Sequence, residues 1–164
     1  MSLEAAGFWG LALVLLASSL AVVLAKNLFH SVLYLALALV ATAGVFLLLQ
    51  AEFLAAVQIL LYAGGVITIV VFAIVVTERL VGERLTQTNR GMVTGGFVSV
   101  AVLIPIIMLV SRAKLPRTPP PLVGDLTEAI GRDLLTRFVL PFELLAVLFL
   151  AALLGAIFFA RKEE

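Results

Sequence analysis

Hydrophobic residues form five long runs along the chain, and short polar segments separate them. The runs extend over about residues 3–25, 28–49, 53–77, 91–110 and 138–160. Each can cross the hydrocarbon core of a bilayer, which is roughly 30 Å thick and takes about 20 helical residues. None shows the period-two alternation of a membrane β-strand, so the runs predict helices. The pattern predicts an all-α integral membrane protein with five transmembrane helices in a single domain over residues 1–164.

The longest polar segment, residues 111–137, contains one amphipathic stretch. Asp125 and Glu128 are typical of a capped helix start. The apolar residues that follow share one face, and they are Leu126, Ile130, Leu134 and Leu135. This pattern predicts a short interfacial helix on the membrane surface before the fifth span. Three prolines at positions 119–121 form a stiff spacer ahead of it.

The third run differs from the others because polar and small residues recur in its middle. Gln58, Tyr62 and Gly65 follow one another at spacings of four and three, and Thr68 continues the row. On a regular helix these residues share one narrow face. Gly64 and Gly65 stand directly after the tyrosine, where each costs roughly 1 kcal/mol of helix propensity relative to alanine. The glycine pair therefore calls for a compensating role.

Two explanations of the glycine pair are open from spacing alone. Gly64 and Thr68 form a small-xxx-small pair, which lets two helix backbones approach closely in a membrane. Alternatively, the helix is irregular at this point, either through a kink at the glycines or through a single π-turn. Both kinds of irregularity recur at functional sites.

Composition limits the chemistry of the chain. Hydrophobic residues make up 63% of it and charged residues 13%, which is not the composition of a water-soluble domain. There is no cysteine and one histidine, so the chain has no disulfide and no thiolate ligand for an iron–sulfur cluster. Asn27 is placed to cap the second helix, and His30 falls in its first turn, where we expect a locally hydrogen-bonded side chain rather than a metal ligand. We expect no cofactor in this chain and no nucleic-acid partner.

Two carboxylates deserve comparison because they lie at or inside apolar runs. Glu52 begins the third run and is either a simple membrane-surface residue or the carboxylate that serves the polar face of that helix. Glu143 follows Pro141 inside the fifth run. Its position fits an acid in the first turn of a helix, which the helix dipole favours. An intramembrane carboxylate is equally typical of a proton path.

Three motifs occur in order between about Asn27 and Gly155, and together they carry a family resemblance. They are Asn27-x-x-His30-Ser31, Glu52-Phe53-x-Ala55-x-x-Gln58-x-x-x-Tyr62-Ala63-Gly64-Gly65, and Leu140-Pro141-Phe142-Glu143 with Gly155. The chain resembles the subunit J family (chain 6 in mitochondria) of proton-pumping NADH:quinone oxidoreductase, respiratory complex I. It departs from the family pattern at Leu28, where proline is usual, and at Gly65, where alanine is frequent.

The resemblance implies a cofactor-free subunit between the quinone-site subunits and the antiporter-like subunits of the membrane arm. Flavin, iron–sulfur clusters, NADH and quinone then belong to partner subunits, and this chain holds no catalytic residue. In the family the third helix carries a π-turn near the tyrosine, and its interconversion with regular helix is proposed to gate a proton or water path. The gating and coupling candidates are Gln58, Tyr62, Gly64, Gly65, Thr68 and Phe72. The candidates for a proton path are Glu143 and Glu52.

The eleven basic residues divide six against five between the two sides of the membrane if the spans alternate. With the family's arrangement, this places the C-terminus in the cytoplasm and the N-terminus outside a bacterial-type inner membrane. Two other function classes stay open. One is a small subunit of a multisubunit cation/proton antiporter or membrane-bound hydrogenase, and the other is a purely structural membrane spacer.

Overall fold

The computed structural model describes residues 3–81, 91–113 and 125–161, and within these ranges every regular element is a helix. The elements are α1 (Leu3–Leu24), α2 (Leu28–Leu48), α3 (Glu52–Val57), the π-helix η1 (Gln58–Val66), α4 (Ile67–Val81), α5 (Met92–Arg112), α6 (Leu126–Leu135) and α7 (Val139–Ala160). The three prolines at 119–121 and several of the basic residues that suggested the orientation lie outside the described residues.

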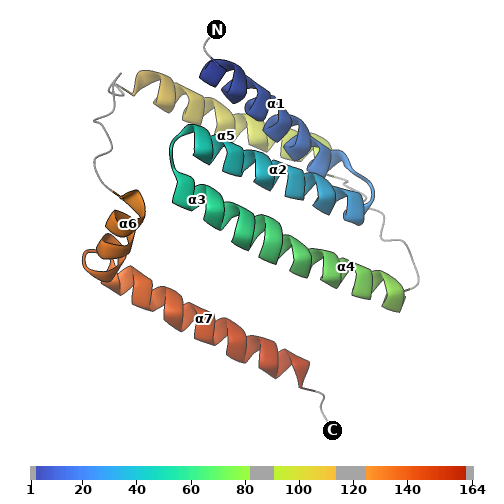
Figure 1. Ribbon diagram of the computed structural model, residues 1–164. Coiled ribbons are helices and arrows are strands. Elements are labelled where there is room, and N and C mark those ends of the chain that lie inside the picture. The colour runs from blue at the N-terminus through green and yellow to red at the C-terminus, as the bar shows by residue number, and fades with distance from the viewer. Residues whose placement is uncertain (1–2, 82–90, 114–124, 162–164) are drawn as a thin grey trace. The chain divides into compact units, whose positions relative to one another are not determined.

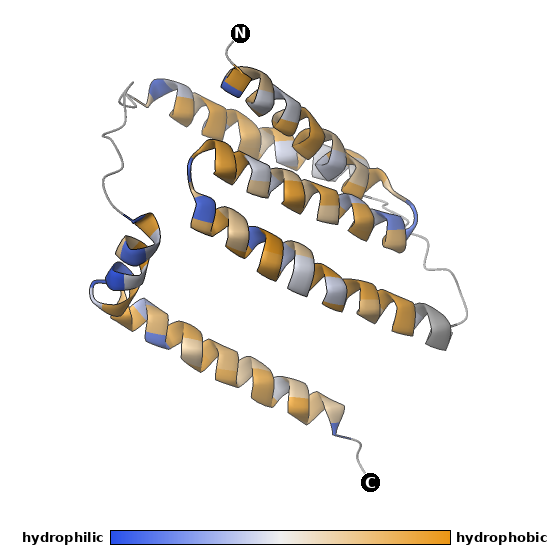
Figure 2. Ribbon diagram, viewed as in Figure 1, coloured by the Kyte–Doolittle hydropathy of each residue, from blue (hydrophilic) through white to orange (hydrophobic). Residues whose placement is uncertain are grey.

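Five stretches are long and apolar enough to cross a membrane, and each lies within two residues of its predicted bounds. They are Leu3–Leu24, Leu28–Leu48, Glu52–Thr77, Val93–Arg112 and Val139–Ala160. Figure 2 shows apolar residues along these helices and hydrophilic residues at the turns from α1 to α2 and from α2 to α3. The prediction of an all-α membrane protein with five spans is confirmed. The chain divides into two compact units, Met1–Pro119 and Pro120–Glu164, and the expected single domain stays a prediction.

In the first unit, α2 lies between α1 and the continuous rod formed by α3, η1 and α4 (Figure 1). Small residues make this central position possible, because Ala38, Ala41 and Ala43 are buried on α2. A Cβ atom at Gly44 would come within 2.8 Å of the Leu11 side chain on α1. The small residues of the second span therefore serve close helix packing, as membrane helices commonly do.

The turn between α1 and α2 is held by side chains of α2. Asn27 caps the helix as predicted, since its side-chain oxygen accepts a hydrogen bond from the amide of Phe29 at 2.9 Å. The buried hydroxyl of Ser31 donates to the carbonyl oxygen of Val22 on α1 at 3.0 Å. The Asn27 cap starts α2, and the Ser31 contact fixes that start against the end of α1.

The turn from α2 into α3 uses a left-handed residue that is not glycine. Gln50 has φ of 58°. The amide of Gln50 donates to the carbonyl of Leu47 at 3.0 Å, and the amide of Ala51 donates to the carbonyl of Phe46 at 2.9 Å. This is the hydrogen-bond pattern of a Schellman motif, which ends α2 sharply and allows α3 to begin at Glu52.

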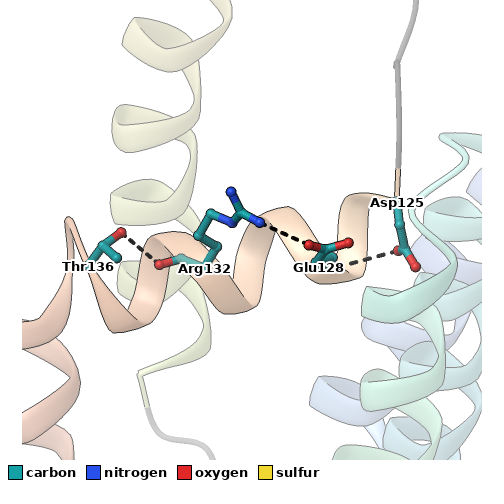
Figure 3. Close-up of polar contacts among 4 residues, drawn as sticks. All are labelled: Asp125, Glu128, Arg132 and Thr136. Atoms are coloured by element: carbon teal, nitrogen blue, oxygen red, sulfur yellow. Dashed lines mark hydrogen bonds and ion pairs between the residues drawn. The ribbon is translucent and has the colours of Figure 1, made fainter.

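In the second unit, a short helix precedes the fifth span as predicted. Asp125 caps α6 by accepting from the amide of Thr127 at 2.8 Å. Figure 3 shows its second, longer contact with the amide of Glu128 at 3.4 Å and the ion pair of Glu128 with Arg132 at 3.0 Å. Beyond α6, the amide of Phe138 donates to the carbonyl of Asp133 at 2.8 Å, and α7 begins at the next residue. The position of α6 on the membrane surface stays a prediction.

Candidate functional site

The third span is not one regular helix, because its middle is the nine-residue π-helix η1. The family resemblance implied a π-turn near Tyr62, and this feature is confirmed. The amide of Ile67, the first residue after η1, donates to the carbonyl of Tyr62 five residues earlier and also to that of Gly64. The carbonyl of Ala63, which a regular α-helix would pair with this amide, is skipped. The hydrogen-bond register of the backbone therefore changes at the end of η1, in the middle of an apolar span.

The glycine pair fits the wide turn rather than a contact with another described helix. A Cβ atom at Gly64 would lie 3.3 Å from the carbonyl oxygen of Ile59, five residues earlier in the same helix. A Cβ atom at Gly65 would lie 3.8 Å from the corresponding oxygen of Leu60, which is ordinary contact. No atom of another described element comes within 4 Å of either position. Within the described chain, the packing explanation therefore lacks a partner helix.

Thr68 lies in the first turn of α4 and bonds back to the π-helix. Its side-chain hydroxyl donates to the carbonyl oxygen of Gly64. A hydroxyl bonded to a carbonyl four residues earlier is a common way for threonine to satisfy itself inside a helix, and such bonds often accompany local bending. The carbonyl of Ile59 thus limits the space for a side chain at Gly64, and the carbonyl of Gly64 is bonded to the next turn.

The buried face of the third span follows an unusual spacing. Ala55, Gln58 and Ile67 are buried, with exposed fractions of 4%, 9% and 7%, and Ala63 is half-buried. The step from Gln58 to Ala63 is five residues, whereas the neighbouring steps are three and four, as on an α-helix. Both η1 and α4 pack against α2. The buried row therefore shifts its register inside η1 and keeps facing the same helix.

The prediction from regular spacing, that one narrow polar face carries Gln58, Tyr62, Gly65 and Thr68, is wrong. Gln58 is buried, but Tyr62 is 49% exposed, and Gly65 and Thr68 are exposed as well. The prediction assumed 3.6 residues per turn, on which seven residues return to the same face. Hydrogen bonds between residues five apart widen the turn, so Gly65 no longer lies above Gln58. Phe72, further along α4, is also exposed.

The two candidate carboxylates lie in different units of the chain. Glu52 is the first residue of α3 and Glu143 the fifth of α7; both are exposed, and neither forms an ion pair with a described residue. The first-turn interpretation of Glu143 is wrong, because α7 begins at Val139, two residues before Pro141. Favourable interaction with the helix dipole falls off within the first turn, so it explains Glu143 less well than expected.

Sequence reasoning missed three features of this site: the burial of Ile67, the skipped carbonyl of Ala63 and the left-handed Gln50. Ile67 and Ala63 are ordinary apolar residues whose role depends on the hydrogen-bond register, which composition does not reveal.

His30 is exposed in the first turn of α2, with its ring edge-on to Phe29. Among the described residues, no three His, Asp or Glu side chains gather into a cluster that could hold a metal ion.

Comparison with known proteins identifies the family. The family model of NADH-ubiquinone/plastoquinone oxidoreductase chain 6 matches residues 18–159. The chain is 37% identical over 150 residues to the chloroplastic NAD(P)H-quinone oxidoreductase subunit 6 of Mesostigma viride, covering 89% of this chain and 78% of the relative. It is 31% identical over 159 residues to NAD(P)H-quinone oxidoreductase chain 6 of Synechocystis, covering 93% of this chain and 78% of the relative.

The alignment with a relative from Methanosarcina mazei covers almost the whole of both chains. The chain is 32% identical over 169 residues to the F(420)H(2) dehydrogenase subunit J of Methanosarcina mazei, covering 99% of this chain and 93% of the relative. The predicted resemblance is confirmed by a family match that spans most of the chain and by relatives whose alignments cover 89–99% of it. This chain belongs to the chain 6 (subunit J) family, the multi-pass membrane subunits of NAD(P)H-quinone oxidoreductase complexes of the complex I type.

Proposed function

We propose that this chain is a coupling subunit in the membrane arm of a proton-translocating quinone oxidoreductase. It lies between the quinone-site subunits and the antiporter-like subunits, and its third span acts as a gate. The chain itself holds no cofactor and no catalytic residue. Flavin, iron–sulfur clusters and the sites for NADH and quinone belong to its partner subunits.

The observation that carries this proposal is the π-helix Gln58–Val66 in the middle of a membrane span. Short π-helical stretches inside α-helices are frequent at functional sites. If the backbone hydrogen bonds changed from residues five apart to residues four apart, the rest of the span would rotate by about 100°. A switch needs its two forms to lie within a few kcal/mol of each other, and paired glycines lower the cost of visiting both.

The gate would act by changing which groups line a wetted path. In the π form, the buried side of the span carries Gln58 together with the apolar side chains of Ala55 and Ile67. In the regular form, Ile67 would leave this side, and Tyr62 and Gly65 would share the face of Gln58. An apolar side chain would therefore be exchanged for polar and small ones that leave room for water.

Glu52 and Glu143 are the carboxylates that we propose for a proton path. Ionisable residues within membrane spans are costly and mark proton relays by default. Glu143 fits this role better than Glu52, because it lies in the second turn of an apolar span whereas Glu52 begins one. We also propose that the C-terminus lies in the cytoplasm and the N-terminus outside.

In this proposal, other subunits bind and oxidise the electron donor. The relatives include an NAD(P)H-quinone oxidoreductase subunit and an F(420)H(2) dehydrogenase subunit, whose names give different donors at similar identity to this chain. A membrane subunit that serves both kinds of complex would act on a step they share, which supports a role in coupling rather than in donor oxidation.

Purification of the chain in mild detergent with its partners tests the proposed assembly. Flavin, iron–sulfur proteins and quinone reductase activity should accompany it. Co-purification with antiporter subunits alone, without flavin or reductase activity, would instead support a cation/proton antiporter. If the complex assembles and pumps normally with an altered third span, the structural spacer is the correct description.

A further inference from the structure

A concave surface lies at the tip of the α1–α2 hairpin, away from the π-helix. It has a volume of about 480 Å³ and is lined by Ala21, Leu24, Ala25, Lys26, Asn27, His30 and Tyr34. This volume falls within the range of roughly 300–1,000 Å³ that is typical of small-molecule sites. We call it the hairpin depression.

The hairpin depression is polar at one end and apolar at the other. Lys26, Asn27 and His30 lie at the turn, between the end of one candidate span at Leu24 and the first turn of the next. Ala21 and Leu24 belong to the last turn of α1, and Tyr34 lies more than one turn further along α2. The depression therefore runs from the membrane boundary toward the hydrocarbon, and tyrosine is enriched at that depth.

The polar end favours an anion. Lys26 is exposed and forms no ion pair with any described residue. Asn27 caps α2, and the start of a helix carries a partial positive charge. His30 adds an imidazole that can donate a hydrogen bond. Among the described residues that line the depression there is no carboxylate to neutralise this end.

The apolar end of the depression favours a lipid over a free anion. A free phosphate would leave the walls formed by Leu24, Ala21 and Tyr34 uncovered. A phospholipid would place its phosphate beside Lys26 and its glycerol and first acyl carbons against these walls. We propose that the hairpin depression binds the headgroup of an anionic phospholipid, with the Lys26 ammonium and the His30 imidazole facing the phosphate.

A photoreactive phosphatidylglycerol probe tests this site in the assembled complex. The complex is reconstituted into nanodiscs that carry the probe, with a matched phosphatidylcholine probe as the comparison, and the cross-linked peptide is identified by mass spectrometry. We expect phosphatidylglycerol to label residues 21–34 in preference to phosphatidylcholine. Equal labelling by the two probes, or no labelling of this segment because a protein subunit covers it, would overturn the proposal.

Variants of Lys26 test the contact itself. Lys26→Gln should lower labelling by phosphatidylglycerol about fivefold, the loss expected for one basic residue at an anionic membrane surface. Lys26→Arg should keep it, and Arg112→Gln, at the end of α5, should leave it unchanged. Undiminished labelling of the Lys26→Gln complex would refute the site. Displacement of the probe by millimolar inorganic phosphate at constant ionic strength would show a free-anion site instead, and the lipid proposal would fail.

Discussion

Gln58 and Ile67 are both buried on the third span, in the two elements that pack against α2, although nine residues separate them. On a regular α-helix nine residues make 2.5 turns, so one of the two side chains would point away from α2. The π-helix between them takes up the difference. Burial of both residues is thus a direct consequence of the irregular hydrogen-bond register.

Gln58→Leu separates the structural from the functional role of the buried amide. The side chain is 9% exposed and has no hydrogen bond to another described residue, so a leucine of similar size should not weaken packing against α2. Among the described residues no side-chain nitrogen or oxygen is both buried and unpaired, so the end of the Gln58 amide reaches the surface of this chain, and assembly should be unchanged by its loss. Coupled proton uptake should fall about tenfold, or ~1.4 kcal/mol in the barrier.

The measurement for Gln58→Leu compares subunit content with proton uptake in vesicles that contain the complex. Ala55→Leu is no suitable control, since it would overfill the contact with α2. Ile59→Leu is better, because Ile59 is an exposed residue of the same π-helix. Normal uptake in the assembled Gln58→Leu complex would remove the amide from the proposed path.

Tyr62→Phe tests the hydroxyl apart from the ring. Tyr62 is 49% exposed in this chain, and the substitution keeps the ring that neighbouring subunits or lipid would contact. We expect a smaller loss of coupled activity than for Gln58→Leu, about threefold or less, in line with the loss of one exposed hydrogen bond of about 0.5–1 kcal/mol. Quinone reduction and proton uptake should fall in parallel; abolition of both would assign the hydroxyl a direct role in proton transfer.

Glu143→Gln tests the carboxylate inside the fifth span. Glutamine keeps the shape and polarity of the side chain but cannot carry a proton, so proton uptake should fall severalfold while all redox centres remain. Glu128→Gln is the matched control, because Glu128 is an exposed acid of the same unit whose ion pair with Arg132 contributes little. Equal activity of the two variants would leave Glu143 without a part in the path.

The orientation can be read with a reporter fused after Glu164. The basic residues are balanced six against five, so the positive-inside rule alone decides weakly. We expect a cytoplasmic reporter to be active and a periplasmic reporter to be inactive at this position. The reverse result would invert the proposed topology and place Lys26 at the outer leaflet.

Span positions were predictable because apolar length and polar breaks determine them, and all five agree within two residues. Asn27 and Asp125 were predictable as caps because their chemistry is local. The face of Gln58 was predicted wrongly, since that argument assumed a regular helix. Local propensity gives no direct signal for a five-residue register, which depends on the balance between backbone pairing and packing along the whole span.

The glycine pair illustrates how much a motif can reveal. Spacing identified Gly64 and Gly65 as irregular or closely packed and left both explanations open. Only the structure separates the two residues, because a Cβ atom at Gly64 would crowd the carbonyl of Ile59 while one at Gly65 would not crowd that of Leu60. This difference arises from the π-helix itself and supplies a matched pair of substitutions.

The comparison of Gly64→Val with Gly65→Val tests the central claim that the π-helix is needed for coupling. Both variants add the same branched side chain and the same helix propensity, but only Gly64→Val strains the wide turn. Assembled complexes are compared by quinone reduction and by proton uptake in vesicles. We expect Gly64→Val to keep all redox centres and lose about tenfold in both activities, and Gly65→Val to lose far less. Full proton uptake by an assembled Gly64→Val complex would contradict the gate, and equal loss of assembly in both variants would favour a packing role.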